Sequence, residues 1–217
     1  MKSTRPAVLL VGLALVTAAC SLADSSRTPR VSSVSLKDGP DDLWSYDLAA
    51  IDDAHRSPVV VNGDALGAEV RRTANALVVK VRYVDIERRA SPDWGIEFEF
   101  DIGDHSTRGV TWSEYRFSDT HQWDRDLDMT RYDSEDSLSA LCRRLSATPD
   151  FSADILAIRV PDGCFRHALR VVVHDLVAHA RPPGRHTEVA YDHLGTPGHG
   201  PVRTPPLVAS DKSRHST

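Results

Sequence analysis

Residues 94–102 read WGIEFEFDI, and this strict alternation is the clearest structural pattern in the chain. Successive side chains of a β-strand point to opposite faces, so every second residue here would share one side. The acidic residues would face water. The residues that would face a core are Trp94, Ile96, Phe98, Phe100 and Ile102. One buried and one wet face is typical of a strand in an antiparallel sheet.

The same alternation recurs along the chain. It is strong over 77–83, 155–160 and 169–177, and weaker over 65–72, 110–117, 122–131 and 138–145. The best helical pattern, 134–145, opens with a serine and acidic residues, yet a strand from Leu138 is preferred there. Short strands with almost no helices predict an all-β fold. We expect an antiparallel β-sandwich, immunoglobulin-like or jelly-roll-like, of about seven to nine strands, with a closed barrel as the alternative.

The N-terminus has the composition of an export leader. Lys2 and Arg5 precede an apolar run over 7–16, and Thr17-Ala18-Ala19 leads directly to Cys20. The run is too short to span a bilayer, which needs about 20 apolar residues. A charged start, an apolar run and a small-residue step predict a secretion signal that is removed from the mature protein.

The step at Ala19-Cys20 resembles the lipobox of bacterial lipoprotein precursors. The resemblance implies that cleavage exposes Cys20 and that its thiol carries a diacylglycerol. Two or more acyl chains hold a protein stably on a membrane. We therefore expect an exported protein on the outer face of the cell membrane, with free secretion as the alternative.

Composition predicts where the domain lies. Residues 1–19 form the signal peptide, and residues 20–40 contain the lipidated cysteine and a Ser-rich flexible tether. Residues 41–194 form the β-sandwich domain. Residues 195–217, rich in Pro, Gly and Ser, form a disordered tail.

The chain is acidic, and its charge excludes some partners. Its formal net charge of −5 falls to −7 when Lys2 and Arg5 leave with the leader. A net acidic surface argues against nucleic acid, which requires clustered cations. It also argues against attraction to acidic lipid head groups through overall charge.

The cysteine count predicts one disulfide. The chain has three cysteines, and lipidation of Cys20 leaves Cys142 and Cys164. An even pair in an oxidising compartment is typical of a disulfide, and no zinc-site spacing is present. On the chain-entropy model such a bond stabilises the fold by about 3 kcal/mol.

Two segments carry a further resemblance. Residues 63–86 (GDALGAEVRRTANALVVKVRYVDI) and 154–173 (DILAIRVPDGCFRHALRVVV) resemble uncharacterised secreted β-sandwich proteins of high-GC Gram-positive bacteria. The resemblance covers about a fifth of the chain. It implies a sandwich fold and export, and no activity comes with it.

An acidic cluster suggests a calcium loop and also a simpler interpretation. Asp124, Asp126, Asp128 and Glu135 have the spacing of an EF-hand loop, but Met129 stands where that loop needs a glycine to turn. On a strand the three aspartates would share one solvated face, with Trp123, Leu127 and Met129 on the other. The solvated face is the preferred interpretation, and a calcium site of another geometry is the minor alternative.

Ten histidines raise the question of zinc or copper. His174 and His179 are five residues apart, so on a regular strand they would lie on opposite faces unless a bulge intervened. His186, His193 and His199 are irregularly spaced in a Gly- and Pro-rich stretch. Surface histidines are the preferred interpretation, and weak metal capture is kept as an alternative.

Tryptophans and acids suggest two functions. Exposed Trp44, Trp112 or Trp123 could stack on a ligand, whereas Trp94 is expected in the core. The first hypothesis is a membrane-tethered, non-enzymatic module that binds a cell-surface glycan, a peptide or an envelope protein.

The second hypothesis is an extracytoplasmic, glycan-directed hydrolase, with calcium as an optional aid. It requires at least two carboxyl groups in one cleft, a defined distance apart. The candidate acids are Asp101, Asp104, Asp124, Asp126 and Asp128. No GxSxG elbow or phosphate-binding glycine loop is present.

Overall fold

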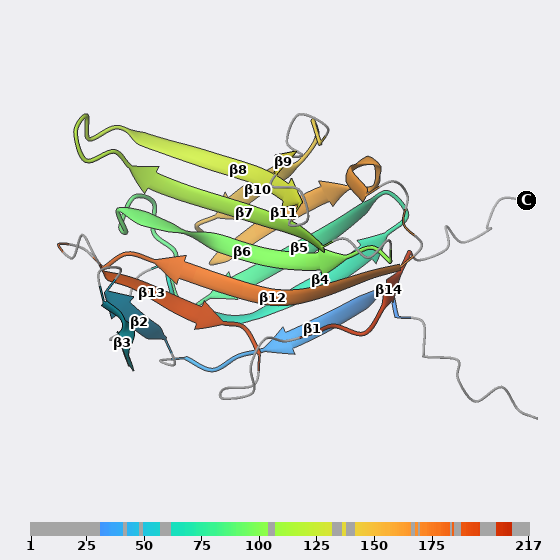
Figure 1. Ribbon diagram of the computed structural model, residues 1–217, viewed down its shortest axis with the longest axis horizontal. Helices are drawn as coiled ribbons and strands as arrows, with labels where there is room; N and C mark the ends of the chain where they lie inside the picture. Colours follow the sequence, from blue (N-terminus) through green and yellow to red (C-terminus); the bar gives the residue numbers. More distant parts are fainter. Residues whose placement is uncertain are drawn as a thin grey trace, which may run out of the picture.

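In the computed structural model, the chain forms two antiparallel sheets packed face to face. The structure describes residues 31–40, 43–47, 50–56, 62–103, 107–131, 136–137, 142–165, 168, 170–182, 184, 188–195 and 203–209. The predicted signal peptide and Cys20 lie outside these residues. Figure 1 shows the larger sheet in front of the smaller one.

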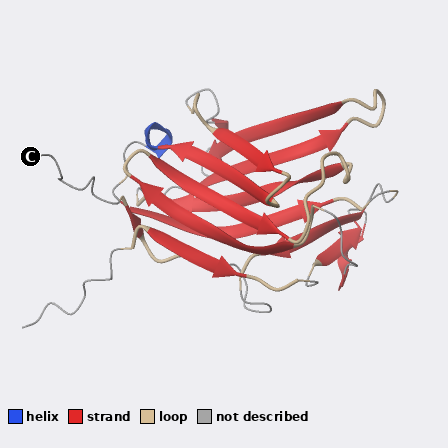
Figure 2. Cartoon of the chain, turned by 180° about the vertical axis from the view of Figure 1, so that it is seen from behind, coloured by secondary structure: helices blue, strands red, loops and turns tan. Residues whose placement is uncertain are grey.

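The smaller sheet has five strands in the order β1-β4-β5-β11-β10, all antiparallel. Figure 2 shows it from its outer side. Its strands are β1 (Ser33–Lys37), β4 (Ala65–Thr73), β5 (Ala76–Tyr83), β11 (Ile155–Pro161) and β10 (Ser146–Asp150).

The larger sheet has nine strands in the order β3-β2-β13-β12-β6-β7-β8-β9, with β14 paired to β12. Its strands are β3 (Ala50–Arg56), β2 (Trp44–Asp47), β13 (Glu188–His193), β12 (Arg170–Ala180), β6 (Asp93–Asp101), β7 (Thr107–Arg116), β8 (Trp123–Arg131), β9 (Asp136–Ser137) and β14 (Leu207–Val208).

The core lies between the sheets and consists of the apolar halves of the alternating strands. Trp94, Ile96, Phe98 and Phe100 of β6 are fully buried. Opposite them, the alternating apolar residues of β5 and β11 are buried as well: Leu77, Val79, Val81, Leu156, Ile158 and Val160. The predicted all-β sandwich is therefore confirmed, as is the strand with one buried face that led to the prediction.

The number of strands exceeds the expectation. The described residues contain fourteen strands rather than about seven to nine. β9 and β14 have only two residues each, too short for alternation to be visible in the sequence. The only helical element in the described part of the chain is the single 3-10 turn η1 (Asp162–Phe165). Of the segment predicted to begin a strand at Leu138, residues 138–141 lie outside the described residues, and the strand that follows, β10, begins at Ser146.

The domain extends beyond both predicted boundaries. Strand β1 lies inside the segment 20–40 that we expected to be a tether, and Val34 and Leu36 pack against the core. In the expected tail, 195–217, Leu207 is fully buried and pairs with Val171 of β12. Described residues at Val31 and at Leu207–Val208, outside the predicted 41–194, thus take part in the fold. Alternating Ser and apolar residues in β1 resemble a tether in composition but form a half-buried edge strand.

The predicted disulfide is present. Cys142 and Cys164 are bonded, with their Cα atoms 5.0 Å apart. The bond joins the turn before β10 to η1, which follows β11. Beside it, Arg72 forms an ion pair with Asp162 and places its guanidinium 4.7 Å from the ring centroid of Phe165. The disulfide therefore closes one end of the smaller sheet.

Strand β12 contains a bulge that corrects the expectation for its histidines. The pairing with β6 shifts register between His174 and Val177, and Asp175 adopts a φ of 55°. His174 then pairs with Glu99 and His179 with Gly95, so both histidines lie on the outer face rather than on opposite faces. Their partners are four residues apart on β6, about 13 Å along the strand, which is too far for a shared ion.

Joint replacement of Cys142 and Cys164 by alanine should lower the free energy of unfolding by about 3 kcal/mol, because the open chain regains loop entropy. Urea denaturation followed by tryptophan fluorescence measures this loss. An unchanged urea midpoint for the double variant would show that the disulfide does not stabilise the fold.

Candidate functional site

The strongest candidate site is built around a buried carboxylate on β7. Glu114 occupies an inward position of this strand, on the same face as Trp112 and Val110, and its side chain is 4% exposed. Trp94 Nε1 donates a hydrogen bond to its Oε2 at 3.1 Å. Arg125 donates from Nε at 2.8 Å and lies with Nη2 at 2.7 Å from Oε1. A buried charge is tolerated because both oxygens are satisfied by strong donors.

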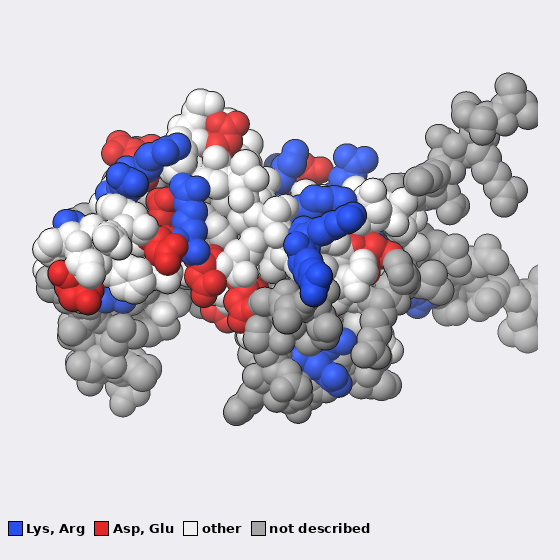
Figure 3. Space-filling model, turned by 90° about the horizontal axis from the view of Figure 1, so that it is seen from above, with Lys and Arg blue, Asp and Glu red and all other residues white. Residues whose placement is uncertain are grey.

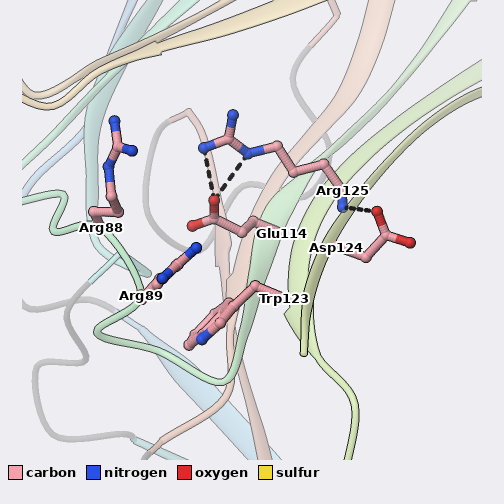
Figure 4. A pocket seen from close by; sticks show the side chains of 6 residues that line it. All are labelled: Arg88, Arg89, Glu114, Trp123, Asp124 and Arg125. Atoms are coloured by element: carbon pink, nitrogen blue, oxygen red, sulfur yellow. Dashed lines mark hydrogen bonds and ion pairs between the residues drawn. The ribbon is translucent and has the colours of Figure 1, made fainter. Parts of the chain in front are cut away.

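The groove beside Glu114 lies between the β7–β8 hairpin and the connection over 84–92, which joins β5 to β6. Its volume is about 320 Å³, near the lower end of the range typical of ligand pockets. Figure 4 shows the side chains that line it: Arg88, Arg89, Glu114, Trp123, Asp124 and Arg125.

Cations and one indole dominate the groove. The guanidinium of Arg89 lies 5.9 Å from the ring centroid of Trp123, within the range of a cation–π contact. Arg88 lies 5.1 Å from the ring centroid of Phe151. Figure 4 shows the Arg89 side chain between Trp123 and Glu114. Three guanidinium groups therefore surround a space bounded by one aromatic face.

The connection that carries Arg88 and Arg89 is held in place by two other segments. Asn62 donates from Nδ2 to the carbonyl of Glu87 at 2.9 Å and accepts from the Glu87 amide at 2.7 Å. The amide of Ile86 donates to Asp154 Oδ1 at 3.1 Å. A loop anchored in this way presents its arginines with less ordering cost on binding.

The local charge of the groove differs from that of the chain. Three arginines and two acids line it, whereas the chain carries a formal net charge of −5. Glu114 is already engaged by Arg125, and Figure 4 shows the carboxylate of Asp124 turned away from Glu114. On the side of the molecule that Figure 3 shows from above, cations and acids lie interspersed. The excess of cations in the groove is thus a local feature that suits an anionic group.

A second groove lies across the hairpin, on the outer side of the larger sheet. It has a volume of about 560 Å³ and is lined by Pro92, Asp93, Ser113, Tyr115, Arg116, Phe117, Ser118, His121 and Arg181. Phe117 is 42% exposed and stacks edge-on with Tyr115 at a centroid distance of 5.2 Å. Arg181 pairs with Asp93 at 3.3 Å. This groove offers an aromatic surface, but its two closest opposite charges neutralise each other.

The three tryptophans proposed for ligand binding have different positions. Trp123 lines the groove beside Glu114, which contains Arg88, Arg89 and Arg125 and is called the arginine groove below. Trp44 is 52% exposed but lies on β2, separated from β8 by four strands, or roughly 24 Å at the usual strand spacing. Trp112 is only 2% exposed and packs edge-on against Trp94 at 4.7 Å, so its indole is unavailable to a ligand. The expectation for Trp112 is therefore wrong, and Trp44 and Trp123 share no groove.

The acidic cluster forms the solvated strand face that was the preferred interpretation. Asp124, Asp126 and Asp128 alternate on β8 with inward-facing residues, and Met129 is fully buried. Among the described residues no group of three His, Cys, Asp or Glu side chains could hold a metal ion. Glu135, the fourth acid of the calcium-loop pattern, lies outside the described residues.

The acids proposed for hydrolysis are dispersed. Only Asp124 lines the arginine groove, while Asp126 and Asp128 follow it along the outer face of β8. Asp101 lies at the far end of β6, with Arg203 Nη2 at 3.3 Å and His174 Nε2 at 3.4 Å. Asp104 lies outside the described residues. The described candidates therefore do not place two carboxyl groups in this groove.

Sequence reasoning missed the residues that define the groove. Glu114 breaks the apolar run on the inner face of β7, and a charge at a core position marks a buried polar contact. The adjacent Arg88 and Arg89 occur in a connection without alternation. Their proximity to Trp123 follows from strand register, which local patterns do not reveal.

Comparison with models of known protein families, with curated proteins and with solved structures found no match. Within the described ranges, no helix is long and apolar enough to cross a membrane.

Replacing Glu114 by glutamine should lower the free energy of unfolding by about 1 to 3 kcal/mol, because a charged acceptor of two buried or half-buried donors is lost. Urea denaturation measures the loss. Asp126→Asn removes one charge from an exposed position of β8 and should change stability by less than about 0.5 kcal/mol. Equal stabilities of the two variants would contradict the role assigned to Glu114.

Proposed function

We propose that this protein is an extracytoplasmic, membrane-tethered binding module without catalytic activity, and that the arginine groove recognises an acidic saccharide of the cell surface. The observation that carries the proposal is the convergence of Arg88, Arg89 and Arg125 around the indole of Trp123. An acidic sugar combines the two features that this groove can recognise, a carboxylate and a flat ring face.

The chemistry of the lining supports this ligand class. Guanidinium groups present donors in a planar fork that matches a carboxylate. An indole offers a rigid apolar face on which a sugar ring can stack, at low conformational cost. The outer Nη1 of Arg125 is free of the bonds that its Nε and Nη2 make with Glu114. Arg125 can thus add a donor to those of Arg88 and Arg89 without releasing the buried carboxylate.

The export leader and the lipobox motif support the location. Twelve residues, 21–32, separate Cys20 from the first residue of β1. A chain of that length reaches at most about 40 Å when fully extended. A lipid on Cys20 would therefore keep the groove close to the membrane and within reach of envelope glycans.

The proposal is tested by titrating a chain of residues 21–217, which retains every described residue, with a uronic-acid oligosaccharide. A neutral oligosaccharide of the same length is the matched ligand. Isothermal calorimetry should detect binding of the acidic oligosaccharide only, because the neutral one lacks the carboxylates that the arginines would pair with.

Variants locate the binding in the groove. Trp123→Ala and Arg89→Gln should each weaken the affinity for the acidic oligosaccharide about tenfold, since one stacking or charged contact contributes on the order of 1 kcal/mol or more. Arg89→Gln removes the charge but keeps a polar, unbranched side chain at a residue whose φ is 63°. Trp44→Ala, on the distant β2, is the control and should bind normally. Equal binding of acidic and neutral sugars, or an equal loss in the Trp44 variant, would refute the proposal.

A further inference from the structure

The outer face of the five-stranded sheet is basic. All five of its strands are described, and their registers define three rows of outward residues. These rows contain two acids, Glu69 and Asp150, and five cations, all of them exposed: Lys37, Arg71, Lys80, Arg82 and Arg159. An excess of cations on one broad face is unexpected in a chain whose formal net charge is −5.

The outer face of the larger sheet has the opposite sign along β6, β7 and β8. The outward positions of β7 carry no charged residue. Those of β6 and β8 carry seven acids: Asp93, Glu97, Glu99, Asp101, Asp124, Asp126 and Asp128. At the strand ends, Arg181 pairs with Asp93 and Arg203 with Asp101. Along these three strands the outer face is therefore acidic, opposite in sign to the outer face of the smaller sheet. An anionic surface would attract the basic face and repel this acidic one.

A hollow on the basic face is suited to an anionic head group. It has a volume of about 380 Å³ and lies over β1, β4 and β5. Three cations, Lys37, Lys80 and Arg82, line it together with one acid, Glu69, which pairs with Lys80 in the strand register. Gly67 lies in the row between Lys37 and Arg82. Its φ is +137°, and a Cβ there would lie 2.4 Å from the carbonyl oxygen of Leu36. The pairing of β1 with β4 therefore requires a glycine at this position.

We propose that the basic face of the five-stranded sheet docks on an anionic phospholipid surface, with a head-group phosphate in the hollow above Gly67. This inference rests on the proposed export and tethering, which place the chain at a membrane. Val31, the first described residue, lies two residues before β1, and β1 is an edge strand of this sheet. A lipid attached to Cys20 would thus hold this edge near the bilayer, while the acidic face points away from it.

The expected strength follows from the number of cations. One Lys or Arg near an anionic membrane surface contributes a factor of about five in affinity. Such attraction falls away beyond the Debye length, which shrinks from about 10 Å at 0.1 M salt to about 3 Å at 1 M. The chain of residues 21–217, without its acyl group, should therefore bind anionic vesicles at low salt and dissociate at high salt.

The test is sedimentation with vesicles of phosphatidylglycerol and phosphatidylcholine in equal amounts, compared with phosphatidylcholine alone. The double variant Lys80→Glu/Arg82→Glu should bind the anionic vesicles at least about 25-fold more weakly. The control Arg116→Glu/Arg170→Glu makes the same change in net charge on exposed residues of the larger sheet and should bind like the parent chain.

Three results would overturn the inference: no binding of the parent chain to anionic vesicles at low salt, equal binding to neutral vesicles, or equal loss in the two double variants. Inorganic phosphate at the concentration of exposed head groups should displace little of the bound chain. Full displacement by free phosphate would assign the hollow to a soluble anion instead. Titration of both double variants with the uronic-acid oligosaccharide separates the two proposals, because normal sugar binding with lost vesicle binding leaves the groove assignment intact.

Discussion

The structure depends on one-sided burial of alternating strands. Trp94, Phe98 and Phe100 of β6 are fully buried against the smaller sheet, and their rings pack edge-on or tilted on neighbouring aromatics. Tyr83 of β5 contacts Trp94 across the two layers at a centroid distance of 6.0 Å. Because the side-chain period of a strand is two, this burial also fixes which residues face outward. The register of the core thereby determines the composition of both outer surfaces.

The same constraint positions the groove. Glu114 falls on the inner face of β7, where only a fully paired carboxylate is stable, and the indole of Trp94 in the core donates to it. Arg125, opposite Glu114 on β8, supplies the second donor. Trp123 lies two residues earlier on the same face of β8 and so reaches the anchored arginines of the β5–β6 connection. Core packing and the proposed binding chemistry are therefore linked through one carboxylate.

Local patterns were sufficient to predict the fold class, the half-buried strands and the disulfide. The strands follow from residue alternation, and the disulfide follows from the cysteine count. Strand β1 was missed, since its serines resemble a tether and its apolar residues are few. The bulge near Asp175 could not be foreseen, and without it His174 and His179 would lie on opposite faces. Trp112 was misassigned because the face of β7 was unknown. The groove and the basic face depend on register between distant strands, which alternation within single strands does not specify.

The most direct test of this account is the hydrogen exchange of the indole N–H groups, measured by NMR with and without a uronic-acid oligosaccharide. The buried, hydrogen-bonded N–H of Trp94 should exchange slowly in both states, and the exposed Trp44 should exchange rapidly in both. Trp123 should become protected only when the acidic ligand is present. Rapid exchange at Trp94 would contradict the packing that orders the sandwich, and an unchanged Trp123 would contradict the groove that this packing positions.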